Sequence, residues 1–306
     1  SSDVCSSDLN LNEKILDTGK LHSYSEKYNN DIIIKLNLIK TKSILNFNDF
    51  LNLGRKMALN IVFNVNKISK SVFNIFSEAN SIYAILNPNF KINNYKDYYN
   101  SLMYHINTPN NYSLINIGTS FTKNNNELFH QIPHFIFPII GLYAITIPRL
   151  ILLLCNHSNY FKIVIDEIYS IENNYKNIYD LLFLRKCILE TLRLNNPVIT
   201  TFRTLAKNFT FDNKYKFKKG TQFLILNNAV LRNSDYFKNN NKFNPYRWNS
   251  DMEDSYYALS FNQGPQKCPG KELAIYLIQS FIYNFIKIFK IGKIGSIILY
   301  SGLLAK

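Results

Sequence analysis

The chain has 306 residues, of which 46% are hydrophobic and 18% are charged, and these fractions exclude a disordered chain. With 10 glycines, 9 prolines and 4 cysteines, it is neither collagen-like nor a disulfide scaffold. Its net charge of +14 would suit nucleic acid or an anionic membrane. Because the lysines are scattered and the residues of AT-rich codons are abundant, we attribute this excess to genome composition and expect no nucleic-acid partner.

The beginning of the chain differs in composition from the rest. Residues 1–9 are rich in Ser and Asp, and we interpret them as an artefact or a disordered leader. Residues 10–306 contain no Pro/Gly/Ser-rich linker, which predicts a single domain. Within it, apolar residues at helical spacing predict a helix over residues 50–63 with Asp49 as its N-cap. The Asn-rich stretch 87–100 is predicted to be a loop.

A long apolar stretch follows in the middle of the chain. Residues 135–155 could cross a bilayer by length. Arg149 lies within this stretch, and Pro138 and Pro148 interrupt its backbone, which is unfavourable in lipid. We therefore predict a buried central helix over about 135–170 instead.

A second helix is predicted over residues 178–194. After it, the spacing of apolar residues changes from helical to alternating. Alternating β-branched and aromatic residues then predict a small β region over 197–231, with a dense lysine run in one of its turns. An irregular polar stretch covers 237–270, and an apolar helix is predicted over 271–290. The expected fold class is mainly α with a small β subdomain.

The cysteines, Cys5, Cys155, Cys187 and Cys268, form no CxxC pair and have no regular spacing. This pattern disfavours a zinc site or a disulfide framework and favours a reducing, intracellular compartment. Cys268 lies in the sequence FNQGPQKCPG, residues 261–270, directly before the last predicted helix. Backbone N–H groups and the positive helix end can stabilise a thiolate at that place. A thiolate is a soft ligand for iron, although a buried, inert cysteine would fit the same loop.

Two further motifs lie upstream of this loop. Glu190 and Arg193 form an E-x-x-R pair on one helix face, and FNPYRW, residues 243–248, contains the only tryptophan. Taken singly, the pair could be a solvated salt bridge and the second motif a loop that packs its aromatics. In this order and spacing, the three motifs resemble the cytochrome P-450 family of haem-thiolate enzymes. The resemblance is specific from about residue 135 to 288.

The resemblance implies a haem b cofactor whose iron is bound through Cys268, the proximal ligand. Phe261, Gly264 and Gly270 match the other fixed positions of the family's haem loop. Gln266 stands where the family commonly has Arg or His on a haem propionate, so a charged contact would become a neutral one.

The resemblance also assigns residues outside the haem loop. Glu190, Arg193 and Arg247 would form the family's structural triad, which locks the meander segment behind the loop. Arg203 lies at the position of a second propionate partner, where a guanidinium can bind a carboxylate through two hydrogen bonds.

The central helix departs from the family pattern. Counting back from His157, Gly141 replaces the family's acid and Leu142 its alcohol, and neither side chain can relay a proton. Thr146, one helical turn beyond, is the candidate substitute. The same loss occurs in family members that rearrange peroxides and need neither dioxygen nor a reductase.

The expected activity is that of a monooxygenase, which inserts one oxygen atom from dioxygen into an apolar small molecule with electrons from a reductase. One alternative is a hydroperoxide-using isomerase, lyase or peroxygenase. Another is a non-catalytic fragment, because the family's first hundred or so residues and their Trp/Arg pair have no counterpart here. Membrane association at the cytoplasmic face is expected through that missing N-terminal part.

Overall fold

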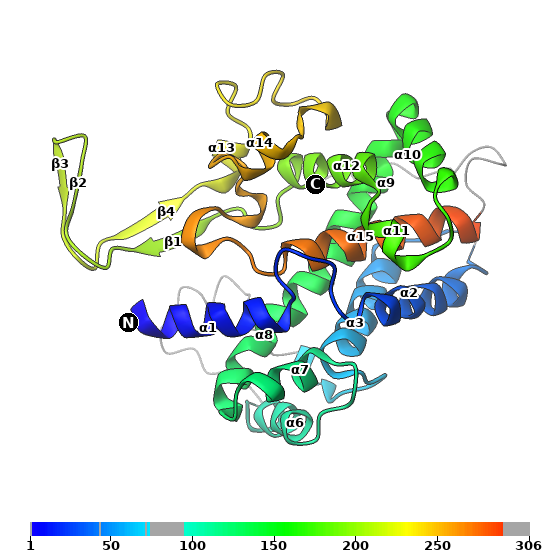
Figure 1. Cartoon of the computed structure of the whole chain (residues 1–306), viewed down its shortest axis with the longest axis horizontal. Helices are drawn as coiled ribbons and strands as arrows, with labels where there is room; N and C mark the ends of the chain where they lie inside the picture. Colours follow the sequence, from blue (N-terminus) through cyan, green and yellow to red (C-terminus); the bar gives the residue numbers. More distant parts are fainter. Residues whose placement is uncertain (1, 43, 71, 74–94, 290–306) are drawn as a thin grey trace.

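The computed structural model describes residues 2–42, 44–70, 72–73 and 95–289. Helices make up most of these residues, and the strands form two short two-stranded sheets. The predicted fold class, mainly α with a small β part, is therefore confirmed. Figure 1 shows the helices gathered in one body, from which the strands project as an arm.

The first part of the chain contributes α1 (Ser2–Ile15), α2 (Ser25–Ile39), α3 (Phe47–Phe63), α6 (Tyr95–Asn107) and α7 (Leu114–Phe121). Most of the stretch interpreted as a leader, residues 1–9, thus has helical backbone as part of α1. The loop predicted over 87–100 is wrong in its last part, because α6 begins at Tyr95. Residues 87–94 lie outside the described residues.

The start of α3 corrects the predicted helix cap. Asn46, three residues before Asp49, is the N-cap, and its side chain accepts a hydrogen bond from the Asp49 N–H at 3.2 Å. The Asp49 carboxylate accepts in return from the Asn46 N–H at 3.0 Å. Asp49 is therefore the third residue of the helix, which closes a capping box with Asn46, and not the cap itself, so α3 begins one turn earlier than predicted.

The central helix consists of α8 (Asn125–Gly141), a π-helical turn η1 (Leu142–Thr146) and α9 (Ile147–Cys155). Pro148 cannot donate an N–H, and its ring would clash with the carbonyl one turn before it. The wider π turn ends two residues before this proline, and such turns let a helix continue through a local disruption. The helix predicted over about 135–170 is divided, because α10 (Ser158–Ser170) begins after a break at His157.

Within the described residues, two stretches, Asn125–Cys155 and Lys271–Phe289, are long and apolar enough to cross a membrane by length and composition. The protein itself buries 56% and 72% of their most apolar windows. A core helix of a large helical domain has the same properties, as expected for the central helix. Gly54 on α3 allows the close packing there, because a Cβ at Gly54 would lie 3.0 Å from Cβ of Tyr143 in the π turn.

The second part of the chain begins with α11 (Tyr175–Tyr179) and α12 (Leu182–Leu194) and ends with α15 (Lys271–Phe289). Between them lie the strands β1 (Thr201–Thr204), β2 (Phe209–Phe211), β3 (Tyr215–Phe217) and β4 (Gln222–Ile225), then α13 (Asn227–Leu231) and α14 (Ser250–Asp254). The single-turn helices η2 (Pro245–Arg247), η3 (Leu259–Phe261) and η4 (Gly264–Gln266) shape the remaining loops. The helix predicted over 178–194 is in fact two helices, because the chain turns at Asp180.

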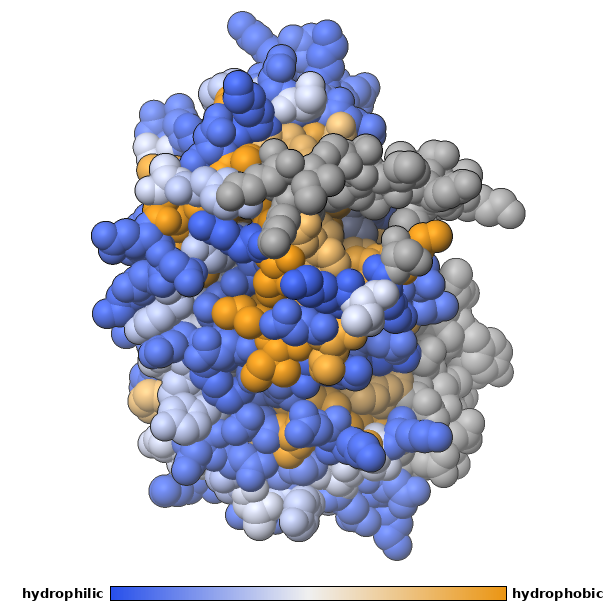
Figure 2. Space-filling view, turned by 90° about the vertical axis from the view of Figure 1, so that its right-hand side faces the viewer, coloured by the Kyte–Doolittle hydropathy of each residue, from blue (hydrophilic) through white to orange (hydrophobic). Residues whose placement is uncertain are grey.

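The core lies where α15 meets α2, α3 and the central helix. Most residues of α15 are buried, and the polar side chains that face α2 find partners there. Asn29 of α2 accepts hydrogen bonds from Ser280 Oγ at 2.8 Å and Asn284 Nδ2 at 2.7 Å, so burial leaves this amide oxygen satisfied. The face shown in Figure 2 is largely hydrophilic, with a hydrophobic area across its middle.

Candidate functional site

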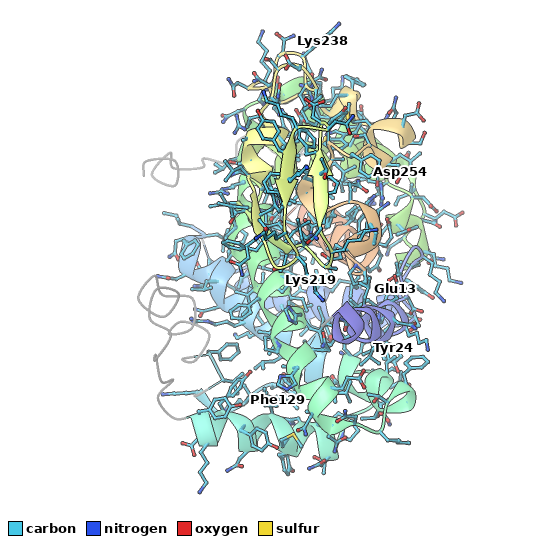
Figure 3. All side chains as sticks on the ribbon, turned by 90° about the vertical axis from the view of Figure 1, so that its left-hand side faces the viewer. Glu13, Tyr24, Phe129, Lys219, Lys238 and Asp254 are labelled. Carbon is cyan, nitrogen blue, oxygen red and sulfur yellow. The ribbon has the colours of Figure 1, made fainter. Side chains whose placement is uncertain are left out.

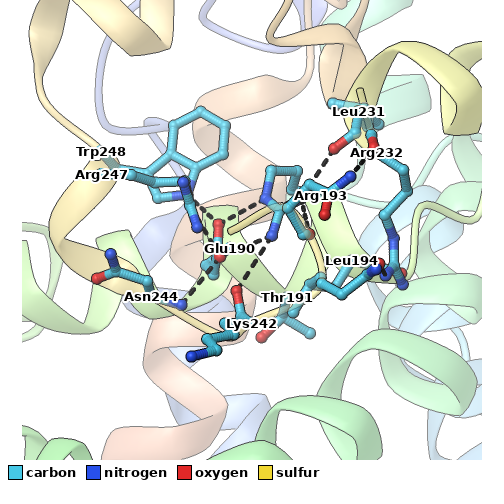
Figure 4. A network of polar contacts seen from close by, with 12 residues as sticks. Glu190, Thr191, Arg193, Leu194, Leu231, Arg232, Lys242, Asn244, Arg247 and Trp248 are labelled. Atoms are coloured by element: carbon cyan, nitrogen blue, oxygen red, sulfur yellow. Dashed lines mark hydrogen bonds and ion pairs between the residues drawn. The ribbon is translucent and has the colours of Figure 1, made fainter. Parts of the chain in front are cut away.

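The Glu190 carboxylate is the centre of a buried hydrogen-bond network (Figure 4). Glu190 and Arg193 are 0% and 1% exposed, and their i, i+3 spacing on α12 sets the two side chains next to each other. Arg193 binds the carboxylate with two hydrogen bonds, from Nε to Oε2 at 2.8 Å and from Nη2 to Oε1 at 2.9 Å. A bidentate contact of this kind fixes both side chains in one orientation.

The remaining donors of Arg193 bind the segment that follows α13. Its Nη1 donates to the carbonyls of Leu231 at 2.8 Å and Asn240 at 2.7 Å. Its Nη2 also donates to the carbonyl of Lys242 at 3.3 Å, and the guanidinium lies over the Phe237 ring. Arg193 therefore holds an irregular segment against α12, because that segment offers its carbonyls to a fixed cation.

Three donors from the FNPYRW segment complete the Glu190 network. Arg247 Nε and the Asn244 N–H both donate to Oε1 at 3.0 Å, and the Trp248 indole donates to Oε2 at 2.9 Å. The structure thus brings together Glu190, Arg193 and Arg247, the residues expected to form a triad. Sequence reasoning missed the roles of Asn244 and Trp248, although a lone tryptophan beside the arginine was a visible signal.

Cys268 lies on the loop that precedes α15. Its N–H donates to the Phe261 carbonyl at 2.8 Å, which closes the loop at its base, and Gly264 adopts φ +75° within it. That left-handed conformation favours glycine. The Cys268 thiol is half-buried and forms no disulfide. Phe261 is also half-buried, and a Cβ at Gly270 would lie 3.4 Å from Cδ1 of Leu16, which follows α1.

The pKa of the Cys268 thiol reflects opposing influences. Burial raises it, whereas the Gly270 N–H and the Lys271 charge act to lower it, and the net pKa lies above the ordinary cysteine value. The backbone N–H and the charge at the start of α15 thus favour the thiolate, as expected. In the chain alone, burial raises the pKa of the thiol by more than these two groups lower it. A bound cation would reverse this balance, because metal coordination deprotonates a thiol.

A second ion cluster, not expected from the sequence, anchors the loop of Cys268. Arg185 on α12 binds Glu272 through Nη1 at 2.7 Å and Nη2 at 2.9 Å, and it also binds Glu253 of α14. Lys271, the first residue of α15, contacts the Glu253 carboxylate at 2.6 Å. The Gln263 amide donates to the Glu253 carbonyl at 3.0 Å. This cluster joins α12, α14 and the loop of Cys268.

The pKa values of these carboxyl groups show that they are ionised pairs. Burial alone would raise the pKa of Glu253 and Glu272, but hydrogen bonds from Arg185 lower both below the ordinary value. Lys271 adds to this effect at Glu253. A small pocket lies between the two clusters, and its lining includes Trp248, Glu253 and Lys271.

Two further residues expected at the site lie outside both clusters. Arg203 is half-buried on β1, and its Nη1 donates to the neighbouring Phe202 carbonyl at 2.9 Å. Within the described residues it has no carboxylate partner. Gln266 is exposed in η4. Neither side chain hydrogen-bonds to Cys268 in the described part of the chain.

The central helix presents few groups that could move a proton. A Cβ at Gly141 would meet nothing within 4 Å, and Leu142 is buried. Thr146 is 1% exposed, and its hydroxyl finds no partner among the described residues. Glu127, near the start of α8, is the acidic residue of this 31-residue helix, and it accepts a hydrogen bond from Thr122.

The donor set of these residues fits a haem. Cys268 offers a free, half-buried thiol, which suits iron. Arg203 offers a guanidinium without a carboxylate partner in the described residues, which suits a propionate. The side of Gly141 is open, so the central helix has free space beside it.

The fold and the site together define a helical domain with a free cysteine on a loop before a core helix, next to two ion clusters on α12. A sequence model of the cytochrome P-450 family matches residues 124–294, more than half of the chain. The chain therefore belongs to the cytochrome P-450 family, as its motifs predicted.

Individual relatives match over a shorter length. Beta-amyrin 11-oxidase of Glycyrrhiza uralensis is 33% identical over 120 residues, which are 39% of this chain and 24% of that protein. Beta-amyrin 16-beta-monooxygenase of Platycodon grandiflorus is 35% identical over 97 residues, or 32% of this chain and 20% of that protein. The matched segment thus spans about a quarter or less of these relatives' length.

Solved structures show the same fold. The cytochrome P450DA heme domain superposes with a TM-score of 0.66 at 15% identity, covering 85% of this chain and 65% of that one. Another cytochrome P-450 gives a TM-score of 0.71 at 14% identity, covering 90% of this chain and 74% of that one.

Proposed function

We propose that this chain is the haem-binding part of a haem-thiolate monooxygenase that oxidises an apolar small molecule. The observation that carries this proposal is the free thiol of Cys268 on a fixed loop before α15. Two of the relatives are named as an oxidase and a monooxygenase of beta-amyrin, which supports an apolar substrate. Electrons would come from a reductase, as in the expected reaction.

Each residue of the site has a defined task in this proposal. Cys268 supplies the thiolate that binds the iron, and Phe261, Gly264 and Gly270 shape its loop. Arg203 forks onto one haem carboxylate, and Gln266 offers a neutral hydrogen bond in place of a charged one. The haem supplies the one-electron and dioxygen chemistry, and the protein orients it and keeps water away.

The oxidant is a separate question, because one observation favours a hydroperoxide. Gly141 and Leu142 carry no group that could deliver a proton to bound dioxygen. Thr146 is the candidate substitute that the sequence offers on the central helix, and its buried hydroxyl has no partner among the described residues. An isomerase, lyase or peroxygenase of the same family is therefore the second candidate function. Turnover of a lipid hydroperoxide without reductase would establish it, and dependence on reductase and dioxygen would exclude it.

A carbon-monoxide difference spectrum of the reduced, purified chain tests the haem proposal. We expect a strongly red-shifted Soret band that is lost in Cys268→Ala, because only a thiolate ligand produces that shift. Cys155→Ala is the matched control, since Cys155 is also half-buried and lies on the central helix. The absence of any Soret band in the wild-type chain would contradict the proposal and favour a non-catalytic fragment.

We also propose an intracellular location for the protein. Cys155, Cys187 and Cys268 are all free thiols, which suits a reducing compartment. Membrane association at the cytoplasmic face remains part of this proposal.

A further inference from the structure

Two tyrosines from different segments of the chain are stacked on the protein surface. The ring centroids of Tyr236 and Tyr257 lie 3.7 Å apart, and the ring planes are 15° from parallel. Tyr236 follows α13, and Tyr257 follows α14. Lys238 and Asp254, which lie in the same two segments, are labelled in the upper part of the molecule in Figure 3. The two tyrosines are 39% and 41% exposed, so an oxidant in solution can reach both side chains.

This pair differs from the other pairs of neighbouring tyrosines in the described residues. Those pairs have ring centroids 5.5 to 6.4 Å apart and ring planes at least 31° from parallel. Near-parallel rings at 3.7 Å have carbon atoms in van der Waals contact. A bond between the rings of Tyr236 and Tyr257 therefore requires less movement than a bond between any of the other pairs.

Buried neighbours hold each of the two tyrosines in place. Phe237, directly after Tyr236, is buried, and the Arg193 guanidinium lies 5.1 Å from the centroid of its ring. Ala258, directly after Tyr257, is buried as well. Each tyrosine is thus exposed while the next residue of its segment belongs to the interior. The two rings are therefore held next to each other before any reaction takes place, which favours a reaction between them.

We propose that Tyr236 and Tyr257 form an oxidative cross-link site, at which a hydroperoxide converts the pair to dityrosine. Each phenol loses one electron and the proton of its O–H group. A carbon–carbon bond then forms between two ring carbons ortho to the oxygens, and the hydrogen on each of these carbons moves to its phenol oxygen. The two electrons and two protons reduce the hydroperoxide to an alcohol and water. A haem peroxidase catalyses the two one-electron steps, so the proposal does not depend on haem binding by this chain.

The cross-link joins two segments that the protein otherwise holds by non-covalent contacts. Tyr236 lies in the segment whose backbone carbonyls bind Arg193. Tyr257 lies just before η3, whose last residue, Phe261, accepts the hydrogen bond from the Cys268 N–H. The new bond closes a loop of about 20 residues, which removes conformational freedom mainly from the unfolded chain. It therefore stabilises the irregular stretch that leads to the loop of Cys268.

Oxidation of the dilute full chain by hydrogen peroxide and a haem peroxidase tests this site. We expect the blue fluorescence of dityrosine and, in peptide maps, a product that joins Tyr236 to Tyr257 and lacks two hydrogen atoms. The yield should not depend on protein concentration, because both rings belong to one chain. Tyr236→Phe and Tyr257→Phe should each lower the yield by at least about tenfold, since phenylalanine keeps the stacked ring but has no phenol O–H.

Three control variants separate stacking from exposure and from wider ring contacts. Tyr256→Phe removes a tyrosine that is 77% exposed. Tyr95→Phe and Tyr112→Phe remove members of the wider pairs. Each control should leave the yield of the cross-linked product unchanged. The emission of the buried Trp248, measured before oxidation, reports whether each variant keeps its fold.

Urea denaturation measures the effect of the cross-link on stability. Because the link closes a loop of about 20 residues, it should lower the equilibrium constant for unfolding by roughly a hundredfold. The same oxidation of Tyr236→Phe should not lower this constant. Equal unfolding constants for the two treated proteins would contradict the constraint that the link is proposed to impose.

Three results of the oxidation itself would overturn the proposal. One is a peptide map in which other tyrosines supply the main cross-link. Another is a dityrosine yield that rises with protein concentration, since the link would then join two chains. The third is complete consumption of hydrogen peroxide without any dityrosine, since the stacked rings would then be in contact for packing alone.

Discussion

Two ion clusters join α12 to the irregular segments that precede α15, and they differ in burial and in how they are assembled. The Glu190 cluster places one carboxylate, 0% exposed, under five hydrogen bonds from two arginines, an indole and a backbone N–H. In the Arg185 cluster, one guanidinium is shared by Glu253 and Glu272, and these three side chains keep 12% to 18% exposure. The first cluster is sealed from water, whereas the second remains open to it.

This difference assigns the clusters different roles. A sealed carboxylate cannot exchange its donors for water, so losing any partner leaves a buried group unsatisfied. A partly exposed cluster can rehydrate, so its contribution is smaller and depends on the charge state of its carboxylates. We infer that the Glu190 cluster determines whether the segment folds, and that the Arg185 cluster adjusts how firmly the loop is held.

The largest effect is expected from Glu190→Gln. This change keeps the shape of the side chain but leaves Arg193 and Arg247 as buried cations without a carboxylate. We expect the free energy of unfolding to fall by roughly 3–5 kcal/mol, measured by urea denaturation of the full chain. Glu172→Gln is the control, because Glu172 is exposed and should change stability by less than about 0.5 kcal/mol. A loss of under about 1 kcal/mol in Glu190→Gln would remove the distinction between the clusters.

The contrast between the clusters also shows what a sequence can and cannot predict. Glu190 and Arg193 are one helical turn apart, so their contact follows from helix geometry, and their link to Arg247 followed from the family motifs. Arg185 is 68 residues from Glu253 and 87 residues from Glu272. No local pattern marks such a pairing, because it depends on how α12, α14 and α15 pack together.

The fold shows the same limit. The central and last helices were predictable from long apolar stretches, and the strands from alternation within 197–231. The boundaries were not, since Asn46 and not Asp49 caps α3, and a break at His157 divides the predicted central helix. These details depend on single side-chain hydrogen bonds, such as the one between His157 Nδ1 and the Leu153 carbonyl at 2.8 Å.

A smaller decrease in the free energy of unfolding is expected from Trp248→Phe, a change within the Glu190 cluster. The ring keeps most of its packing, but Oε2 of Glu190 loses the indole donor at 2.9 Å. We expect a loss of about 2 kcal/mol, as for a hydrogen bond to a buried charged group. Tyr256→Phe, in the same region but 77% exposed, should have no measurable effect. Equal stability of the two variants would mean that the indole only fills space.

The smallest effect on stability is expected from Glu253→Gln/Glu272→Gln, and this effect should depend on pH. The folded chain lowers the pKa of both carboxyl groups below the ordinary value of 4.5. Their stabilising contribution is therefore complete above that value, and it is lost as the pH falls through the lowered folded pKa values. At neutral pH we expect the variant to be less stable than the wild type by about 1–2 kcal/mol.

The difference between the two proteins should shrink below about pH 4, because protonation makes the wild-type carboxyls neutral like the amides. Urea denaturation at a series of pH values measures both curves. Glu13→Gln/Glu172→Gln removes two exposed carboxylates and controls for net charge. If the difference in the free energy of unfolding stays constant with pH, shape and packing, not the ion pairs with Arg185, account for the contribution of the second cluster. The distinction between a sealed and an open ion cluster would then not hold for the Arg185 cluster.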